Sequence, residues 1–154
     1  MNVIELLKAD HTLVAGLFRK VEESPDSEHP AIFTKIKTEL DAHAHIEETL
    51  FYPKLKADGD KNLVDITLEG IEEHHQMKMF LKEIAALTGK ADEFEPKLKV
   101  LIEDVEHHVK EEEGKMFPLV KAQFKADVLD KLGADMEAEK TKFKGSHSKA
   151  AAGR

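Results

Sequence analysis

The apolar positions of this chain recur in steps of three and four residues, which is the repeat of one face of an α-helix. Breaks rich in Pro, Gly and Asp divide the pattern into long segments. The sequence therefore predicts four long helices, over residues 2–23, 31–56, 62–87 and about 92–124. A fifth segment, 126–143, has few apolar residues, so we expect it to pack on the outside of the others.

Four helices with short connections favour an antiparallel up-down bundle. The 154 residues are enough for one domain with one apolar core. We therefore predict an all-α protein in which residues 1–124 form a four-helix bundle and residues 125–143 a short peripheral helix. Residues 144–154 are small and basic, and we expect a flexible tail there.

Polar residues interrupt the apolar stripes in a regular way. Each of the four stripes carries one histidine, and two of them carry a glutamate one helical turn later: His11, His43, Glu47, His74, His108 and Glu112. Side chains four residues apart lie on one helix face about 5–6 Å from each other, so each His–Glu pair can bind one ion. Buried carboxylates without a partner cost several kcal/mol each, and the pattern therefore predicts a metal site. The alternative is a metal-free core in which protonated histidines pair with the glutamates.

The second half of the chain repeats the first. Residues 43–53 read HAHIEETLFYP and residues 108–118 read HVKEEEGKMFP, with Glu four and Pro ten positions after the His in both. On the preceding helices, Asp10-His11 corresponds to Glu73-His74. Two similar hairpins suit two metal ions side by side, with one carboxylate from each hairpin available as a bridge.

The order H…HxxxE…H…HxxxE, with its E-E-x-x-apolar-aromatic-Pro endings, resembles the hemerythrin family, in particular the bacterial HHE cation-binding domains. The resemblance covers about residues 1–124. It implies an up-down four-helix bundle around a non-haem di-iron centre, with two Fe ions that also share an oxo or hydroxo bridge. It places the iron ligands on His11, His43, Glu47, His74, His108 and Glu112, the two Glu bridging the ions.

The chain departs from the oxygen-carrying hemerythrins at the third helix. The carriers have an H-x-x-x-H pair there, whereas Lys78 stands four residues after His74 in this chain. The second carboxylate is also a Glu at the fourth position rather than the carriers' Asp at the fifth. One iron would therefore have an open or water-filled position, or take another ligand, which puts reversible oxygen carriage in doubt.

Tyr52 is the further candidate for that position. It lies nine residues after His43, which on an ideal helix places it about 180° away. The adjacent Pro53 can distort the helix and bring the phenolate toward the metal.

The other histidines are expected to lie in a linker, in the tail or on solvated faces: His29, His45, His75, His107 and His147. Glu48 and Glu113 are expected around the ligands or in solvent rather than on the metal.

Composition narrows the function classes. The absence of cysteine excludes disulfides, thiolate metal sites and iron–sulfur clusters. A net charge of −8 is poor for binding nucleic acid. No apolar run approaches the length of a membrane span, and no secretory leader is visible, so a cytoplasmic protein is expected.

Two functions fit the site best. The first is an iron pair that reacts with oxygen, peroxide or nitric oxide, with peroxide consumption of the catalase or peroxidase type as one form. The second is a non-catalytic module that binds or senses oxygen or iron. A ferritin-like oxidase or iron store is disfavoured, because it needs two E-x-x-H motifs and the chain has one, within residues 72–75.

Overall fold

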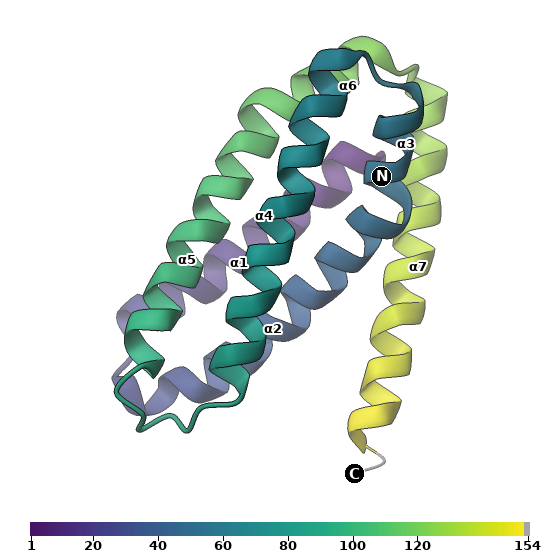
Figure 1. Cartoon of the computed structure of the whole chain (residues 1–154). Helices are drawn as coiled ribbons and strands as arrows, with labels where there is room; N and C mark the ends of the chain where they lie inside the picture. Colours follow the sequence, from purple (N-terminus) through teal and green to yellow (C-terminus); the bar gives the residue numbers. More distant parts are fainter. Residues whose placement is uncertain (153–154) are drawn as a thin grey trace.

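The computed structural model of the chain describes the backbone of residues 1–152 and the side chains of residues 1–147. Every regular element in this part of the chain is helical (Figure 1). The all-α class predicted from the sequence is therefore confirmed. None of the described helices is both long and apolar enough to cross a membrane.

Four helices carry the predicted apolar stripes, and we call them the long helices of the two hairpins: α1 (Val3–Glu23), α2 (His29–Ile46), α4 (Lys61–Ala85) and α5 (Phe94–Glu111). The side chain of Asn2 accepts from the N–H of Glu5, and the Glu5 carboxylate accepts from the N–H of Asn2 in return. Asp60 caps α4 by accepting from the N–H of Leu63. These side chains satisfy N–H groups that the first helical turn leaves unpaired, and so fix where α1 and α4 begin.

Each long helix runs back along the one before it (Figure 1). α1 packs on α2 and α4 packs on α5, and the two hairpins meet where α2 contacts α4 and α1 contacts α5. A short 3-10 turn, η1 (Asp26–Glu28), lies in the first connection. Two short helices, α3 (Tyr52–Asp58) and α6 (Phe117–Gln123), extend the second helix of each hairpin. The sequence repeat is thus a repeat of two helical hairpins.

Two apolar clusters fill the space between the helices. One contains Leu7 and Phe51, and the other contains Phe18 and Leu98. On each long helix, the histidine predicted as a ligand falls between the residues of the two clusters. Each buried large apolar side chain stabilises the fold by about 1.5–3 kcal/mol, so the clusters can offset the cost of a polar layer between them.

The helical repeat changes at equivalent points of the two hairpins. η2 (Glu47–Phe51) and η3 (Glu112–Met116) are π-helical turns, and the residue after each turn donates its N–H to the glutamate that opens it. Pro53 and Pro118 come directly after these residues. Proline has no N–H and its ring crowds the carbonyl four residues earlier, so a wider turn accommodates it. The inserted residue rotates the rest of the helix by about 100° relative to a continuous α-helix.

The peripheral helix is longer than the sequence pattern indicated. α7 (Ala126–Ala152) lies along α1 and α2, and it continues well past residue 143 (Figure 1). The expected tail, 144–154, therefore begins as helix, and its residues 153 and 154 lie outside the described residues. The prediction stopped where the apolar positions stop, but the Lys and Ala residues beyond that point are good helix formers.

Gly133 lets α7 pass close to the start of α1. A Cβ at this position would collide with the carbonyl oxygen of Met1 and would lie 2.7 Å from the backbone nitrogen of Val3. These are backbone atoms, which cannot rotate away as a side chain can. The glycine is therefore required by the packing of α7 rather than by its own conformation.

We expect Gly133→Ala to lower the free energy of unfolding by about 1–3 kcal/mol, because the added methyl group pushes α7 away from α1. Thermal unfolding followed by circular dichroism measures the effect. Gly145→Ala is the matched control, since a Cβ on Gly145 of the same helix would meet nothing within 4 Å. Equal melting temperatures for the two variants would contradict the close approach.

Candidate metal centre

The six residues selected from the sequence converge in the polar layer between the apolar clusters. They form two overlapping groups, one of His11, His43 and Glu112 and one of Glu47, His74, His108 and Glu112. Within each group, one candidate ligand atom from every residue lies within 4.8 Å of all the others. All six side chains are buried. We call His11 and His43 the N-terminal pair, and His74 and His108 the C-terminal pair.

Each glutamate lies between the two histidine pairs. Glu47 Oε1 is 3.0 Å from Nε2 of His43 in the N-terminal pair and 3.1 Å from Nε2 of His74 in the C-terminal pair. Glu112 also reaches both pairs, but with a different oxygen for each: Oε1 is 3.1 Å from Nε2 of His11, and Oε2 is 3.3 Å from Nε2 of His108. Both carboxylates are therefore positioned to bridge two ions, one at each pair.

A second set of carboxylates holds the other ring nitrogen of every histidine. The four contacts from carboxylate oxygen to Nδ1 are Asp10–His43 at 2.9 Å, Glu48–His74 at 2.9 Å, Glu73–His108 at 2.6 Å and Glu113–His11 at 2.6 Å. An acceptor at Nδ1 keeps the ring proton on that nitrogen and leaves the Nε2 lone pair free for an ion. All four rings are thus oriented with Nε2 toward the centre of the layer.

Tyr52 also reaches this layer, on the side of the C-terminal pair. Its hydroxyl oxygen lies 3.2 Å from His74 Nε2 and 3.3 Å from His108 Nε2, and it donates to Glu112 Oε2 at 2.7 Å. The π turn before it explains the orientation, because the inserted residue turns the side chain back toward the face that carries Glu47.

Nearby carboxylates favour the protonated forms of His43 and His108 in the metal-free protein. Burial alone would lower the pKa of His108, but its interactions with carboxylates, above all Glu112, raise that pKa to about 10. Burial opposes protonation of His43 too, yet Glu47 and other carboxylates raise its pKa well above the ordinary value. Burial and the two nearby glutamates raise the pKa of the Tyr52 phenol, so it stays protonated without a cation.

Two atoms in the described part of this layer are buried without a hydrogen-bond partner. They are Nε2 of His43 and Oε2 of Glu47. The His43 nitrogen lies close to the other Glu47 oxygen, but that approach lacks hydrogen-bond geometry. A buried polar atom without a partner costs about 1–3 kcal/mol, which a bound cation would remove. Imidazole nitrogens and carboxylate oxygens suit iron, zinc or manganese, so the donor set fits a pair of such ions.

A cavity of about 30 Å³ lies beside the four histidines. Apolar side chains form most of its wall, among them Val14, Met77, Leu81 and Val105. About 10–15 Å³ of such space is enough to hold one water molecule, so this cavity has room for a molecule of only a few atoms. The space next to the candidate site therefore fits only a very small molecule.

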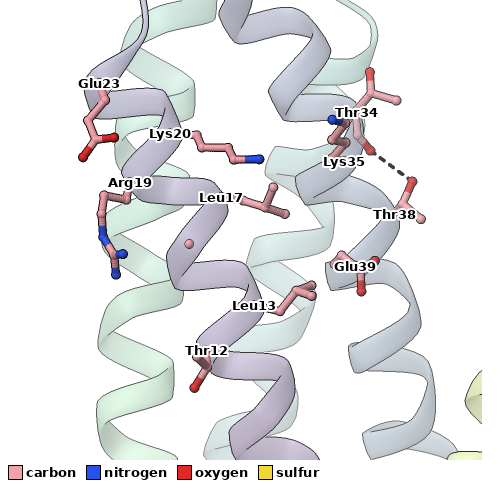
Figure 2. Close-up of a pocket in the computed structure, with 11 residues that line it drawn as sticks. Thr12, Leu13, Leu17, Arg19, Lys20, Glu23, Thr34, Lys35, Thr38 and Glu39 are labelled. Carbon is pink, nitrogen blue, oxygen red and sulfur yellow. Dashed lines mark hydrogen bonds between the residues drawn. The ribbon is translucent and has the colours of Figure 1, made fainter.

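A groove of about 660 Å³ runs along the outer side of α1 and α2, away from this layer. Figure 2 shows Leu13 and Leu17 directed into it, with Lys20 and Lys35 at its sides. None of the six candidate ligands lines this groove. It is larger than the inner cavity but has none of the chemistry that the sequence singled out.

The remaining histidines lie outside the site. His75 and His107 are exposed, and His45 pairs with Glu139 at 2.9 Å. His147 lies on α7 and stacks on Phe143, with ring centroids 3.9 Å apart. Lys78, at the position of the missing fifth histidine, donates to Glu48 and lines the cavity beside the four histidines.

His29 differs from the expectation of a linker residue, because it is buried at the start of α2. Its Nε2 donates to the carbonyl oxygens of Val21, at 2.7 Å, and Ser24, at 3.0 Å, while Nδ1 donates to Glu95. Asp26 lies 3.8 Å from Nδ1. A ring that donates from both nitrogens is protonated, so His29 ties the end of α1 to the start of α5 as a cation.

We expect His29→Ala to lower the melting temperature without changing metal content. Burial alone would lower the pKa of His29, but Glu95 and the two carbonyls raise it above the usual 6.5. A raised folded-state pKa means that the stabilisation is complete below about pH 6.5 and is lost as pH rises through the folded-state pKa. The gap in melting temperature between wild type and variant should therefore narrow from pH 6 to 9. A gap independent of pH in this range would contradict the charged state.

Sequence reasoning did not assign a role to Asp10 or Glu73. Both directly precede the first histidine of their hairpin. The repetition of an acidic residue at this position in both hairpins could have indicated their role. Glu48 and Glu113, which directly follow the buried glutamates, were expected near the ligands or in solvent. The structure places them on the Nδ1 atoms of the opposite hairpin's first histidine.

Comparison with solved structures gives a close relative of this fold. A crystal structure of a hemerythrin HHE cation-binding domain-containing protein from Mycobacterium kansasii has a TM-score of 0.80 and 30% sequence identity. The match covers 95% of this chain and 89% of that protein.

Curated relatives give the same picture. An uncharacterised protein of Mycobacterium tuberculosis is 33% identical over 150 residues, covering 95% of this chain and 89% of its own length. A DNA nickase of a Nostoc species is 29% identical over 147 residues, and the match covers 93% of this chain but 40% of the nickase. The family profile described as the hemerythrin HHE cation binding domain matches residues 2–120. The chain therefore belongs to the hemerythrin HHE cation-binding domain family.

Proposed function

We propose that this chain is a non-haem di-iron protein built on an antiparallel up-down four-helix bundle. The N-terminal pair would hold one iron and the C-terminal pair the other, with Glu47 and Glu112 as bridges. One observation carries this proposal: each glutamate lies within hydrogen-bond distance of Nε2 from both pairs, while a carboxylate holds every Nδ1. Charge neutralisation alone would not require this arrangement. Histidines and glutamates could pair without all four Nε2 atoms being directed at the two central carboxylates.

Tyr52 completes the ligand set at the C-terminal pair in this proposal. Lys78 is unavailable, because its ammonium group donates to Glu48. The Tyr52 hydroxyl oxygen lies 3.2 Å and 3.3 Å from the two Nε2 atoms of the pair, which are themselves 3.2 Å apart, so an ion held by both nitrogens would also be within reach of this oxygen. A bound cation would lower the pKa of the phenol, which the carboxylates raise in its absence.

We propose oxygen, peroxide or nitric oxide as the reacting molecule, with peroxide consumption as the form of turnover. When bound, the iron pair would supply the redox chemistry. The protein's own part is to orient the imidazoles, to exclude bulk water with the apolar wall and to limit access by size. The small cavity beside the histidines, about 30 Å³, supports a reactant of a few atoms over a bulky substrate.

The alternative is a non-catalytic module that binds or senses oxygen or iron. One observation favours this alternative: the charged side chains in the cavity wall are all held in ion pairs, so none is free to exchange a proton with a reactant. Asp41 is paired with Lys37, Lys78 with Glu48 and Asp10 with Lys140. Such groups are poorly placed to act as a general acid or base, so turnover would have to be centred on the metal.

Nucleic acid is not proposed as a partner. The Nostoc relative is named a DNA nickase, but this chain matches only 40% of its length. The net charge of −8 also works against binding to a phosphate backbone.

Metal analysis by mass spectrometry, with absorption spectra in air and after peroxide, tests the proposal. We expect about two iron ions per chain, by analogy with two-metal sites of this kind. Rapid peroxide loss would favour the enzyme, and a stable spectrum would favour the binding module. A chain that holds no metal, and takes up none on anaerobic incubation with ferrous iron, would refute the di-iron proposal.

A further inference from the structure

The polar half of α7 contacts the bundle at the level of the candidate metal centre. In the first half of α7, the side chains on the inner face are apolar and buried: Leu129, Leu132 and Met136. Farther along the same face, at helical spacing, Lys140 donates to Asp10 and Lys144 donates to Glu39 at 2.7 Å. The helix is therefore held by apolar packing at one end and by ion pairs at the other.

Lys140 is connected to a candidate ligand through a single carboxylate. Oδ1 of Asp10 accepts from Lys140, and Oδ2 of Asp10 lies 2.9 Å from Nδ1 of His43. Only 7% of the Asp10 side chain and 20% of the Lys140 side chain are exposed. A buried carboxylate that uses both oxygens in this way has its orientation fixed from both sides, and the His43 ring is fixed with it.

The equivalent carboxylates elsewhere in the site have weaker support. Glu73, the counterpart of Asp10 in the second hairpin, and Glu113 pair with no Lys or Arg among the described residues. Glu48 does pair with Lys78, but that lysine is 49% exposed and belongs to the bundle itself. Lys140 is thus the less exposed of the two lysines that pair with these carboxylates, and it comes from the peripheral helix.

We propose that Lys140 is a positioning residue of the metal centre, through which α7 holds Asp10 and hence His43, and thereby slows loss of the ion at the N-terminal pair. This inference rests on the proposed di-iron function. It gives α7 a role beyond packing, because displacement of the helix would loosen one ligand of one ion. The C-terminal pair has no contact of this kind with α7 in the described residues, so the two ions would differ in how firmly they are held.

The test is the rate at which the iron-loaded full chain loses iron to an excess of chelator. Loss of a carboxylate behind a ligating histidine commonly costs 10–100-fold in metal affinity, and Lys140 acts one step farther out, so we expect Lys140→Met to release one ion about tenfold faster. The second ion should leave at the wild-type rate. Lys140→Arg should restore the wild-type rate, since a guanidinium can also bind Asp10.

Lys144→Met is the matched control. The substitution removes the same charge from the same helix face. Lys144 pairs with Glu39, however, and Glu39 does not contact a candidate ligand. Circular dichroism of each variant checks that the fold is retained. Equal iron loss from Lys140→Met and Lys144→Met would overturn the inference, because both would then act only by anchoring α7.

A double-mutant cycle separates the proposed route from general loosening. If Lys140 acts through Asp10, Lys140→Met adds nothing in the Asp10→Asn background. An equal effect in both backgrounds would overturn the inference while leaving the di-iron proposal intact. If the wild-type chain takes up no iron, both the inference about Lys140 and the di-iron proposal are overturned. In that case no iron release is measured from any variant.

Discussion

Glu112→Ala is expected to weaken metal binding by more than about 100-fold, so that the purified variant retains little iron. Changes behind a ligand already cost 10–100-fold, and this substitution removes the carboxylate that is proposed to bind both ions. Glu112 approaches Nε2 of both His11 and His108, and its removal would open both halves of the centre together. Metal content by mass spectrometry, measured after anaerobic loading with ferrous iron, gives the result.

The fold should survive this change in the metal-free state. Burial opposes ionisation of Glu112, but the charge of His108 and the hydrogen bonds with His108 and His11 hold the pKa of Glu112 well below its usual value. Without that charge His108 loses much of the reason for its raised pKa and can become neutral, which avoids an isolated buried cation. An unchanged far-UV circular dichroism spectrum with lost metal is therefore the expected combination.

His147→Ala is the control for Glu112→Ala, since it removes an exposed imidazole on α7. It should bind as much iron as the wild type. His74→Ala should resemble Glu112→Ala, because it removes a ligand of the C-terminal pair. Full iron content in Glu112→Ala or His74→Ala would show that the ligand assignment is wrong.

The six buried polar residues could be found from the sequence because their positions obey helical geometry. A histidine on an apolar stripe with a glutamate one turn later is a local pattern, and its duplication in residues 43–53 and 108–118 made it specific. The meeting of these residues in one layer followed from the short connections, which force neighbouring helices to pack. These parts of the site need only the period of the helix and the order of the segments.

Two of the four carboxylates behind the histidines, Asp10 and Glu73, could not be found in this way. Asp10 and Glu73 look like ordinary solvent-facing acids, and their partners lie on the neighbouring helix, so the pairing depends on how two helices are rotated about their axes. Lys140 is farther still from its partner along the chain. Stripe analysis also missed His29, because its contacts are with carbonyl oxygens at the end of α1, and such contacts leave no periodic signal.

Tyr52 stands between these two cases. Pro53 indicated that the helix would be disturbed, but the direction of the disturbance depends on a π turn that adds one residue. Ideal helix geometry places Tyr52 on the far side of the helix from His43, whereas the π turn places its hydroxyl against the C-terminal pair. The sequence could name this residue as a candidate but could not orient it.

Tyr52→Phe is expected to weaken iron binding at the C-terminal pair about 10–100-fold while leaving the N-terminal pair occupied. Iron content after exhaustive dialysis should therefore fall from about two toward about one ion per chain, as expected for loss of one half of a two-metal site. If the phenolate binds ferric iron, the wild-type protein also has a visible charge-transfer band, and the variant lacks it. Both measurements are made on the same samples, so loss of the band can be compared directly with loss of the ion.

The internal repeat supplies the reason to expect an asymmetric result. Phe117 occupies the position in the second hairpin that Tyr52 occupies in the first, and it stacks against His11 with ring centroids 6.0 Å apart. Tyr52→Phe therefore makes the two halves alike at this position, each with an apolar ring beside its histidines. The variant loses a hydrogen bond to an ionised group, worth about 1.5–3 kcal/mol, but it keeps the ring and its packing, so it should still fold. Equal loss of both ions would mean that the phenol supports the bridge formed by Glu112 rather than one ion, and full retention of both would exclude Tyr52 as a ligand.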